Sequence, residues 1–487
     1  MPNTLMPAMH TPKLFSTARP AAPAVLCALA ALLCFFTSPA LAQEDKPVDP
    51  ALAATFRNLI EEMQTTGTGV VGLAAAVAMP DGGRWEGAVG SSSVDLALEP
   101  GMLQGIGSIT KTYVAALILK LEEEGRLSIN DSLHRWLPAY ANVDSTITIR
   151  QLLNHTSGIY NYLENSAVND SLLLDLNRSW TPEEILAYFV KPRDFAPGRG
   201  WHYSNTNYVL LGMIAEKVTG RPVEVEIRER LLAPNGLAHT FFPEHEMLEG
   251  DIANPWSDVT GDQVADDIVA FPREGIHSLA WAAGAMFSTP EDLVTWGRAL
   301  YAGNVLSSES LEKMLTFRTV QFGTCDGYGL GIMRFKVAGR TVYGHGGNVL
   351  GYSSLLLYSP QDRVTVALIV NETTDVTGAG LYLMATAIEN AVSSVHAANG
   401  AARGFSAVTA RRDNAGNAIA LNYTLGEPGT VRATLHDLLG NEVASITTDH
   451  LTAGTHTLRL GADNLPRGIY FYRLAGGTHM VSGKVTL

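Results

Sequence analysis

Cysteine is nearly absent from this chain of 487 residues. Only Cys27, Cys34 and Cys325 occur, and the first two lie in an N-terminal segment that we expect to be removed. Because Cys325 alone cannot form an intramolecular disulfide, such bonds are excluded as a source of stability in the mature chain. The fold must therefore depend on a buried core, and a hydrophobic content of 46% is sufficient to build one.

Positive charge is also scarce, and metal-binding motifs are missing. The chain has 34 lysines and arginines against 48 acidic residues, which gives a formal net charge of −14. An acidic chain of this kind argues against nucleic acid as a partner. His245-Glu246 has no second histidine at the spacing of a zinc-binding helix, so we predict no metal and no other cofactor.

One uninterrupted apolar stretch, residues 24–36, lies near the N-terminus. It follows Lys13 and Arg19 and precedes Ala40-Leu41-Ala42, a small-x-small site before polar residues. The stretch is shorter than the roughly 20 residues that a membrane-spanning helix needs. We therefore predict that residues 1–42 are a secretory signal peptide, and that the mature chain has no transmembrane anchor. The expected location is the periplasm, the cell surface or the medium.

Residues 43–396 are predicted to form one domain with strands at both ends and helices in the middle. The patterns indicate helices at 50–65, 108–124 and 380–395, and a mainly helical segment over 127–315. They indicate strands at 70–79, 84–89, 331–337, 340–343, 352–358 and 364–370. This order favours an α+β fold, in which one antiparallel sheet is flanked by helices and a helical lobe is inserted. A site is expected in the groove between sheet and lobe.

The C-terminal part has a different composition. Small and polar residues over 397–408 predict a linker. Beyond it, segments such as 430–436, 455–460 and 468–474 alternate between apolar and polar residues and are separated by Gly, Asp and Asn. Short alternating strands of this kind predict that residues 409–487 form a small β-sandwich.

The most informative stretch is Gly107-Ser108-Ile109-Thr110-Lys111, which is followed by an apolar run. The run predicts a buried helix, with Lys111 one turn after Ser108 and on the same face. Poor solvation and the helix dipole both disfavour the charged form of such a lysine and lower its pKa. A neutral lysine beside a serine is a base beside a nucleophile.

Ser-x-x-Lys is a weak signal by itself, and it occurs a second time at Ser310 and Lys313. That copy follows Ser307-Ser308-Glu309, so it is better interpreted as the solvated first turn of a polar helix. An N-cap followed by a charged residue is also an alternative for Ser108. No Gly-x-Ser-x-Gly surrounds Ser108, because position 106 is isoleucine, which disfavours an α/β-hydrolase.

Two further motifs follow in the sequence. A glycine-rich loop, 197–204, brings Tyr203 and Asn205 to the start of an apolar helix. Later, His345, Gly347 and Asn348 lie at the end of a predicted strand, where the glycines permit close approach of a substrate backbone. Taken singly, Tyr203 and His345 could both be hydrogen-bonded core residues.

Together, these three motifs resemble those of the penicillin-recognising serine hydrolases. This group includes the class C β-lactamases, the D-alanyl-D-alanine carboxypeptidases, the D-aminopeptidases and related esterases. The resemblance extends over about 50–395 and includes the segments 147–158 and 283–293. It implies a β-lactamase/transpeptidase-like fold and covalent catalysis through an acyl-enzyme.

The resemblance also implies roles for individual residues. Ser108 would be the nucleophile, Lys111 would take its proton or lower its pKa, and Tyr203 would carry the proton to the leaving group. Asn205 would hold the substrate amide or the lysine. His345, Gly347 and Asn348 would bind substrate, with the backbone N–H groups of Ser108 and Asn348 as the oxyanion hole.

His345 departs from the β-lactamase branch, which usually has lysine at this position. A histidine is largely neutral near pH 7 and is a weaker partner for a substrate carboxylate. The sequence therefore favours a carboxypeptidase, D-aminopeptidase or esterase acting on a small molecule or a peptidoglycan-derived peptide. The alternatives are a β-lactamase with good β-lactam turnover and a non-catalytic receptor for cell-wall fragments.

The C-terminal part has a resemblance of its own. The segments 431–443, 451–456 and 465–474 are similar to the sorting domains of type IX secretion. This resemblance implies secretion machinery as a partner. The alternative is a generic immunoglobulin-like module, for example one that binds glycans.

Overall fold

The computed structural model describes residues 45–67, 70–243, 246–398, 405–413, 418–437, 442–462, 465–466, 469–476 and 479–487. The predicted signal peptide, residues 1–42, lies outside this part of the chain. Within it, no helix combines the length and the apolar character that crossing a bilayer requires.

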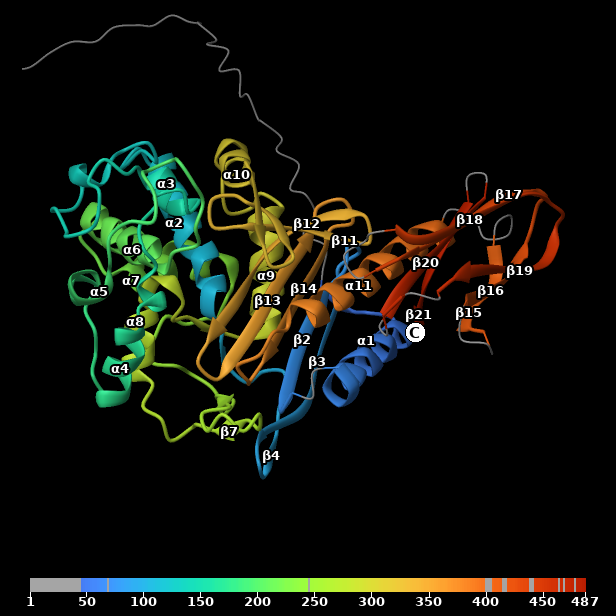
Figure 1. Cartoon of the computed structure of the whole chain (residues 1–487), viewed down its shortest axis with the longest axis horizontal. Helices are drawn as coiled ribbons and strands as arrows, with labels where there is room; N and C mark the ends of the chain where they lie inside the picture. Colours follow the sequence, from blue (N-terminus) through green and yellow to red (C-terminus); the bar gives the residue numbers. More distant parts are fainter. Residues whose placement is uncertain are drawn as a thin grey trace, which may run out of the picture. The chain divides into compact units, whose positions relative to one another are not determined.

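A ten-stranded sheet lies at the centre of the fold, with the order β1-β3-β2-β14-β13-β12-β11-β10-β9 and with β4 paired to β3 (Figure 1). Its neighbours are antiparallel except for the short β1 beside β3, so the sheet is mixed rather than wholly antiparallel as predicted. The strands are β1 (Lys46–Pro47), β2 (Gly72–Ala78), β3 (Gly83–Ser93), β4 (Leu96–Ala97), β9 (Arg318–Phe322), β10 (Cys325–Tyr328), β11 (Met333–Val337), β12 (Arg340–Val349), β13 (Tyr352–Ser359) and β14 (Val364–Val370).

Both faces of the sheet are covered, and the residues of β2 show how. Every residue of β2 is buried. Ala76 and Ala78 belong to the core on one face, whereas Ala75 and Val77 belong to the core on the other. Because side chains alternate along a strand, a strand buried on both faces must be apolar throughout. This explains the uninterrupted apolar sequence of β2.

Helices form the layers on the two faces (Figure 1). On one face α11 packs against β13 and β14, and α1 packs against β3; on the other face α9 packs against β2, β13 and β14. The helices are α1 (Pro50–Glu62), α2 (Thr110–Glu123), α3 (Ile149–Leu153), α4 (Ser166–Leu174), α5 (Pro182–Phe189), α6 (Asn205–Thr219), α7 (Val223–Ile227), α8 (Glu274–Ala280), α9 (Pro290–Tyr301), α10 (Ser308–Met314) and α11 (Thr377–Ala398).

The predicted helical segment contains α3 to α10, and it also contains strand pairs that the sequence did not indicate. Within this segment β6 (Trp256–Ser257) pairs with β7 (Asp266–Asp267), and β8 (Phe287–Ser288) pairs with β5 (Gln104–Gly105), which lies outside the segment just before the Ser108 motif. The pairing of β5 with β8 brings the Ala283 region next to Ser108. The predicted fold class, with a sheet, flanking helices and a helical lobe, is confirmed.

Two small antiparallel sheets follow α11, as expected for this region. One has the order β15-β16-β19, the other β18-β17-β20-β21, and both contribute to one core. Their strands are β15 (Phe405–Arg412), β16 (Ala418–Leu425), β17 (Gly429–His436), β18 (Glu442–Leu451), β19 (Gly454–Gly461), β20 (Ile469–Gly476) and β21 (His479–Thr486). The predicted linker 397–408 overlaps the end of α11 at Ala398 and the start of β15 at Phe405, and its residues 399–404 lie outside the described part of the chain.

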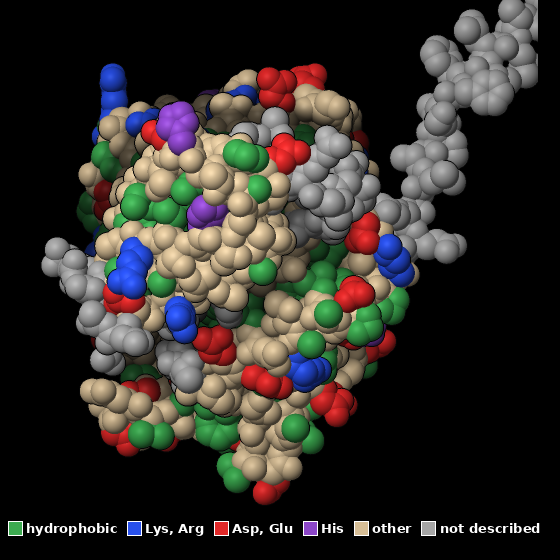
Figure 2. All heavy atoms as spheres, turned by 90° about the vertical axis from the view of Figure 1, so that its right-hand side faces the viewer, with side chains coloured by type: hydrophobic (Ala, Val, Ile, Leu, Met, Phe, Trp, Pro, Cys, Tyr) green, Lys and Arg blue, Asp and Glu red, His purple; other side chains and the backbone are tan. Residues whose placement is uncertain are grey.

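The C-terminal sheets also contact the helix before them. The ring of Phe471 in β20 packs on that of Tyr382 in α11, with centroids 5.9 Å apart. Figure 2 shows the side of the molecule on which β15 to β19 lie, and acidic and basic side chains are interspersed there rather than gathered by sign.

Candidate active site

Ser108 lies in a single 3₁₀ turn, Gly107–Ile109, directly before α2. Gly107 has φ +49°, a conformation that favours glycine. A Cβ atom at this position would lie 2.5 Å from the backbone nitrogen of Asn348 in β12. The turn can therefore press against β12 only because residue 107 has no side chain, and this contact brings the backbones of Ser108 and Asn348 together.

Lys111 is fully buried in the first turn of α2 and contacts three oxygen atoms. Its Nζ lies 2.9 Å from Ser108 Oγ, 2.8 Å from Asn205 Oδ1 and 2.5 Å from the carbonyl oxygen of Ala283. None of these oxygens is a carboxylate. Burial lowers the pKa of Lys111 well below its ordinary value of 10.5, because nothing negative compensates the loss of hydration.

These contacts suit the neutral amine. A neutral amine has two N–H donors and one lone pair. If the donors serve Asn205 Oδ1 and the Ala283 carbonyl, which can only accept, the lone pair faces the Ser108 hydroxyl. A base within hydrogen-bond distance of a hydroxyl has the geometry that proton abstraction requires.

Tyr203 and Asn205 meet the same centre from the start of α6. Lys111 Nζ lies 5.1 Å from the centroid of the Tyr203 ring. Burial raises the pKa of the Tyr203 phenol, while its hydrogen bond with Ser108 acts in the opposite direction. The side-chain amide and the backbone N–H of Asn205 both donate to Asn161 Oδ1, at 3.2 and 3.1 Å.

Asn161 and Ala283 were not singled out from the sequence. Asn161 orients Asn205 so that its oxygen faces Lys111, and Ala283 supplies a backbone carbonyl. A backbone carbonyl carries no sequence signature. Asn161 lies just after the stretch 147–158, and Ala283 begins the stretch 283–293. Both stretches carried the family resemblance, and this nearness was the one sequence signal for the two residues.

Gly347 and Asn348 lie at the pocket edge of β12, opposite Tyr203. Asn348 Oδ1 accepts a hydrogen bond of 2.5 Å from Ser353 Oγ. Ser354 Oγ donates to the carbonyl oxygen of Ile106 at 2.9 Å, which ties β13 to the chain just before Ser108. The structure thus brings together Ser108, Lys111, Tyr203, Asn205, Gly347 and Asn348.

His345 differs from its expected position. It is fully buried and lies behind the pocket, which is lined by its neighbours Gly346, Gly347 and Asn348. Both ring nitrogens are engaged by protein atoms, Nδ1 with the carbonyl oxygen of Gly346 at 2.6 Å and Nε2 with Tyr328 Oη at 3.0 Å. This geometry offers no direct contact between His345 and a substrate.

The second Ser-x-x-Lys copy belongs to the polar helix start that the sequence favoured. Ser307 Oγ accepts from the backbone N–H of Ser310 at 3.2 Å and caps α10. Lys313 pairs with Glu309 at 2.9 Å and with Glu122 at 3.2 Å.

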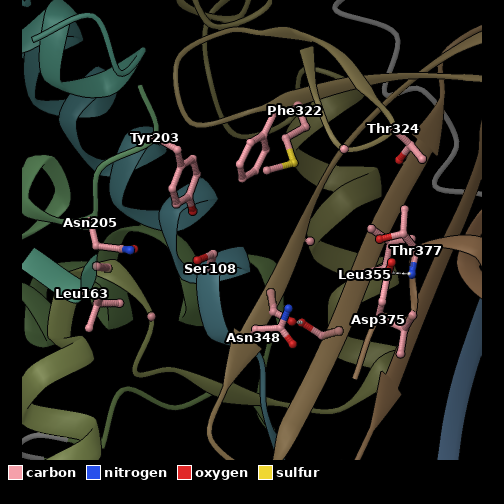
Figure 3. A pocket seen from close by; sticks show the side chains of 18 of the residues that line it. Ser108, Leu163, Tyr203, Asn205, Phe322, Thr324, Asn348, Leu355, Asp375 and Thr377 are labelled. Atoms are coloured by element: carbon pink, nitrogen blue, oxygen red, sulfur yellow. Dashed lines mark hydrogen bonds between the residues drawn. The ribbon is translucent and has the colours of Figure 1, made fainter. Parts of the chain in front are cut away.

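A pocket of about 510 Å³ opens in front of Ser108 (Figure 3). In the figure the Tyr203 hydroxyl points toward Ser108, and Phe322 lies beside Tyr203, with which its ring stacks at a centroid distance of 5.2 Å. Much of the lining is apolar: Leu163, Ala280, Phe322, Met333, Phe335, Leu355 and Val376. Among the described residues, Asp375 is the one ionisable acid or base on this surface apart from tyrosine. The same part of the chain has no group of three His, Cys, Asp or Glu residues placed to hold a metal.

Comparison with known proteins agrees with this geometry. The family model described as beta-lactamase matches residues 55–387, more than half of the chain. Penicillin-binding protein 4* of Bacillus subtilis (strain 168) is 30% identical over 291 residues, which are 57% of this chain and 62% of that protein. The match thus spans about three fifths of that curated relative.

Solved structures give the same result. A D-stereospecific amidohydrolase from Streptomyces sp. is 35% identical with a TM-score of 0.58, and the match covers 66% of this chain and 94% of that one. D-amino acid amidase from Ochrobactrum anthropi SV3 is 25% identical with a TM-score of 0.63, covering 71% and 99%. The chain belongs to the beta-lactamase family of serine hydrolases, which confirms the enzyme class expected from the sequence.

Proposed function

We propose that this protein hydrolyses amides, peptides or esters of D-amino acids through an acyl-enzyme on Ser108. The observation that carries the proposal is the uncompensated, buried Lys111 with its Nζ 2.9 Å from Ser108 Oγ. Lys111 accepts the Ser108 proton as Oγ attacks the substrate carbonyl carbon. Tyr203 passes a proton to the leaving group, and the acyl ester is then hydrolysed by water.

The carbonyl oxygen becomes negatively charged during attack and needs donors. The backbone N–H groups of Ser108 and Asn348 are proposed as the oxyanion hole, since the Gly107 turn presses the two backbones together. Asn205 holds Lys111 on one side, and on the other Gly347 lets β12 lie close to Ile106, whose carbonyl oxygen would be 2.0 Å from a Cβ atom at residue 347.

The charge of the pocket supports one substrate class over the others. β-Lactams and D-alanyl-D-alanine peptides carry a carboxylate near the scissile bond, which favours a cationic partner. The pocket lining within the described residues contains no lysine, arginine or histidine, and its charged member is Asp375. An apolar pocket with one carboxylate suits an apolar D-amino acid with a free ammonium group. We therefore place D-aminopeptidase, amidase or esterase activity before carboxypeptidase and β-lactamase activity.

The test is a comparison of kcat/KM for matched substrates. D-Phenylalanine amide should be hydrolysed faster than L-phenylalanine amide, and both D-Ala-D-Ala peptide and a chromogenic cephalosporin should be poorer substrates. Ser108→Ala should lose at least about a thousandfold in rate, and intact-mass spectrometry should find a fluorophosphonate adduct only on the wild type. A Ser108→Ala variant with full activity would remove the basis of the proposal, and efficient cephalosporin turnover would restore the β-lactamase alternative.

Export and sorting are proposed as well. The apolar stretch 24–36 with its cleavage site supports removal of residues 1–42 and delivery to the periplasm, cell surface or medium. The segment similarities at 431–474 support recognition of the C-terminal sheets by type IX secretion machinery. Fusing residues 401–487 to a reporter in a host with this machinery tests the proposal. A reporter that stays in the periplasm would favour a binding module instead.

A further inference from the structure

A chain of buried hydrogen bonds runs beneath the pocket. His155 Nε2 lies 3.1 Å from Tyr328 Oη, and Tyr328 Oη lies 3.0 Å from His345 Nε2. At one end, the backbone N–H of Ser204 donates to His155 Nδ1 at 3.1 Å. At the other, His345 Nδ1 lies 2.6 Å from the carbonyl oxygen of Gly346. The side chains of His155, Tyr328 and His345 are all fully buried.

The partners at the two ends determine the direction of every hydrogen bond. A backbone N–H can only donate, so His155 Nδ1 is the acceptor and its proton is on Nε2. A carbonyl can only accept, so His345 carries its proton on Nδ1. Two neutral imidazoles then require that His155 Nε2–H donates to Tyr328 Oη and that the Tyr328 hydroxyl donates to His345 Nε2.

Neighbouring groups agree with this assignment. The Asn207 amide also donates to His155 Nδ1, at 3.1 Å, while its oxygen accepts from Ser157 Oγ at 2.7 Å. The Tyr208 hydroxyl also contacts Tyr328, but it donates to the carbonyl oxygen of Leu153 at 3.0 Å, so Tyr328 does not receive its proton. Burial lowers the pKa of both His155 and His345, which keeps the two imidazoles neutral.

The ends of the chain lie on opposite sides of the pocket. Ser204 directly follows Tyr203 and precedes Asn205, and the His155 ring packs on the Tyr203 ring with centroids 4.4 Å apart. Gly346 lies at the edge of β12 beside Gly347 and lines the pocket. Tyr328, at the end of β10, is the link between the two sides.

We propose that Tyr328 is a positioning residue, whose hydroxyl joins His155 and His345 into one chain that holds Tyr203 and the β12 edge in register around Ser108. The inference rests on the proposed function only in that Ser108 and Tyr203 are taken to do the chemistry. It assigns His345 a role in orienting its own strand, and it explains why histidine suits a position that does not touch the pocket.

Kinetics of Tyr328→Phe test the role. The variant keeps the ring but removes both hydrogen bonds, so the rate of acylation should fall by about ten- to a hundredfold while KM changes by less than about threefold. Tyr301→Phe is the matched control, because Tyr301 is buried and its hydroxyl has no hydrogen-bond partner in the described structure. A Tyr328→Phe variant as active as Tyr301→Phe would overturn the inference.

A double variant separates positioning from general destabilisation. Tyr328→Phe and His345→Asn break the same chain, so their combined loss in acylation rate should be close to the larger single loss. Two losses that multiply would show that the residues act independently and would contradict the chain.

Nitrogen NMR of 15N-histidine-labelled wild-type protein gives a readout that needs neither variants nor substrate. Three histidines should stay largely neutral from pH 8 to pH 5, because burial also lowers the pKa of His277 to about 4. Among them, His155 should be protonated on Nε2 and His345 on Nδ1. If His155 and His345 carry the proton on the same nitrogen, the chain does not exist and the inference fails whatever the kinetics show. An inactive Ser108→Ala with a fully active Tyr328→Phe would refute the role of Tyr328 and leave the proposed function in place. An active Ser108→Ala would refute the proposed function too.

Discussion

Replacing His345 with asparagine should change how the stability of the protein depends on pH. Burial, with Lys111 nearby, lowers the pKa of His345 from 6.5 to about 3. In the unfolded chain this histidine binds a proton below pH 6.5, whereas in the folded protein it stays neutral. The unfolded state thus binds more protons between these values, and the stability that is present above pH 6.5 is lost as the pH falls toward 3.

The size of the effect follows from the two pKa values. At pH 5 the proton on the unfolded histidine favours unfolding by about 2 kcal/mol, and at pH 7.5 by less than about 0.1 kcal/mol. Asparagine does not titrate, so the His345→Asn variant escapes this loss. At pH 7.5 the variant should be less stable by roughly 1–3 kcal/mol, because the buried Tyr328 hydroxyl loses its acceptor.

Urea unfolding, followed by tryptophan fluorescence at several pH values between 7.5 and 5, measures both the pH-dependent loss in the wild type and the constant loss in the variant. When the free energy of unfolding is plotted against pH, the curves of wild type and His345→Asn should come closer by about 2 kcal/mol between pH 7.5 and pH 5. His134→Asn, which removes an exposed histidine, is the control for the substitution itself. Parallel curves for His345→Asn would mean that His345 is not held neutral by the fold.

Three further changes test other parts of the structure. Lys111→Met should lose at least about a thousandfold in turnover. It should also remove a pH dependence of the wild type, whose free energy of unfolding, measured by urea unfolding, should rise by up to about 1.4 kcal/mol per pH unit at alkaline pH. The free energy rises with pH because the buried amine binds fewer protons than the same amine in the unfolded chain. Gly107→Ala should abolish acylation by a fluorophosphonate, since its methyl group would lie 2.5 Å from the backbone nitrogen of Asn348. The control is Gly125→Ala, which is also at positive φ but has open space around it. It should keep acylation and lose only about 1 kcal/mol of the free energy of unfolding. A chain ending at Ala398 should hydrolyse esters like the longer protein but unfold at a lower temperature. Removal of Phe471 uncovers Tyr382, which lowers the free energy of unfolding by about 1–3 kcal/mol. Loss of hydrolysis in a folded truncated chain would contradict this prediction.

The sequence alone was sufficient where structure depends on neighbours along the chain. The apolar run after Ser108 predicted a buried helix, and α2 is buried from Thr110 to Leu119. Spacing by three residues placed Lys111 beside Ser108, because helix geometry is local. Likewise, apolar segments predicted the strands β13 and β14 close to their observed bounds.

The local environment of His345 could not be obtained in this way. The family resemblance implied a substrate-binding position, with a hydrogen-bonded core histidine as the alternative, and the choice between them depends on Tyr328 and His155, which come from other parts of the chain. The same holds for the carbonyl of Ala283 and for Asn161, which complete the surroundings of Lys111 and Asn205. Hydrogen bonds between distant segments form only when the sheet and the helical lobe pack together. Sequence therefore determined which reactive residues are present and on which elements they lie. Tertiary structure decided which of them face the pocket and which support it from behind, because burial and partner choice are properties of the packed chain.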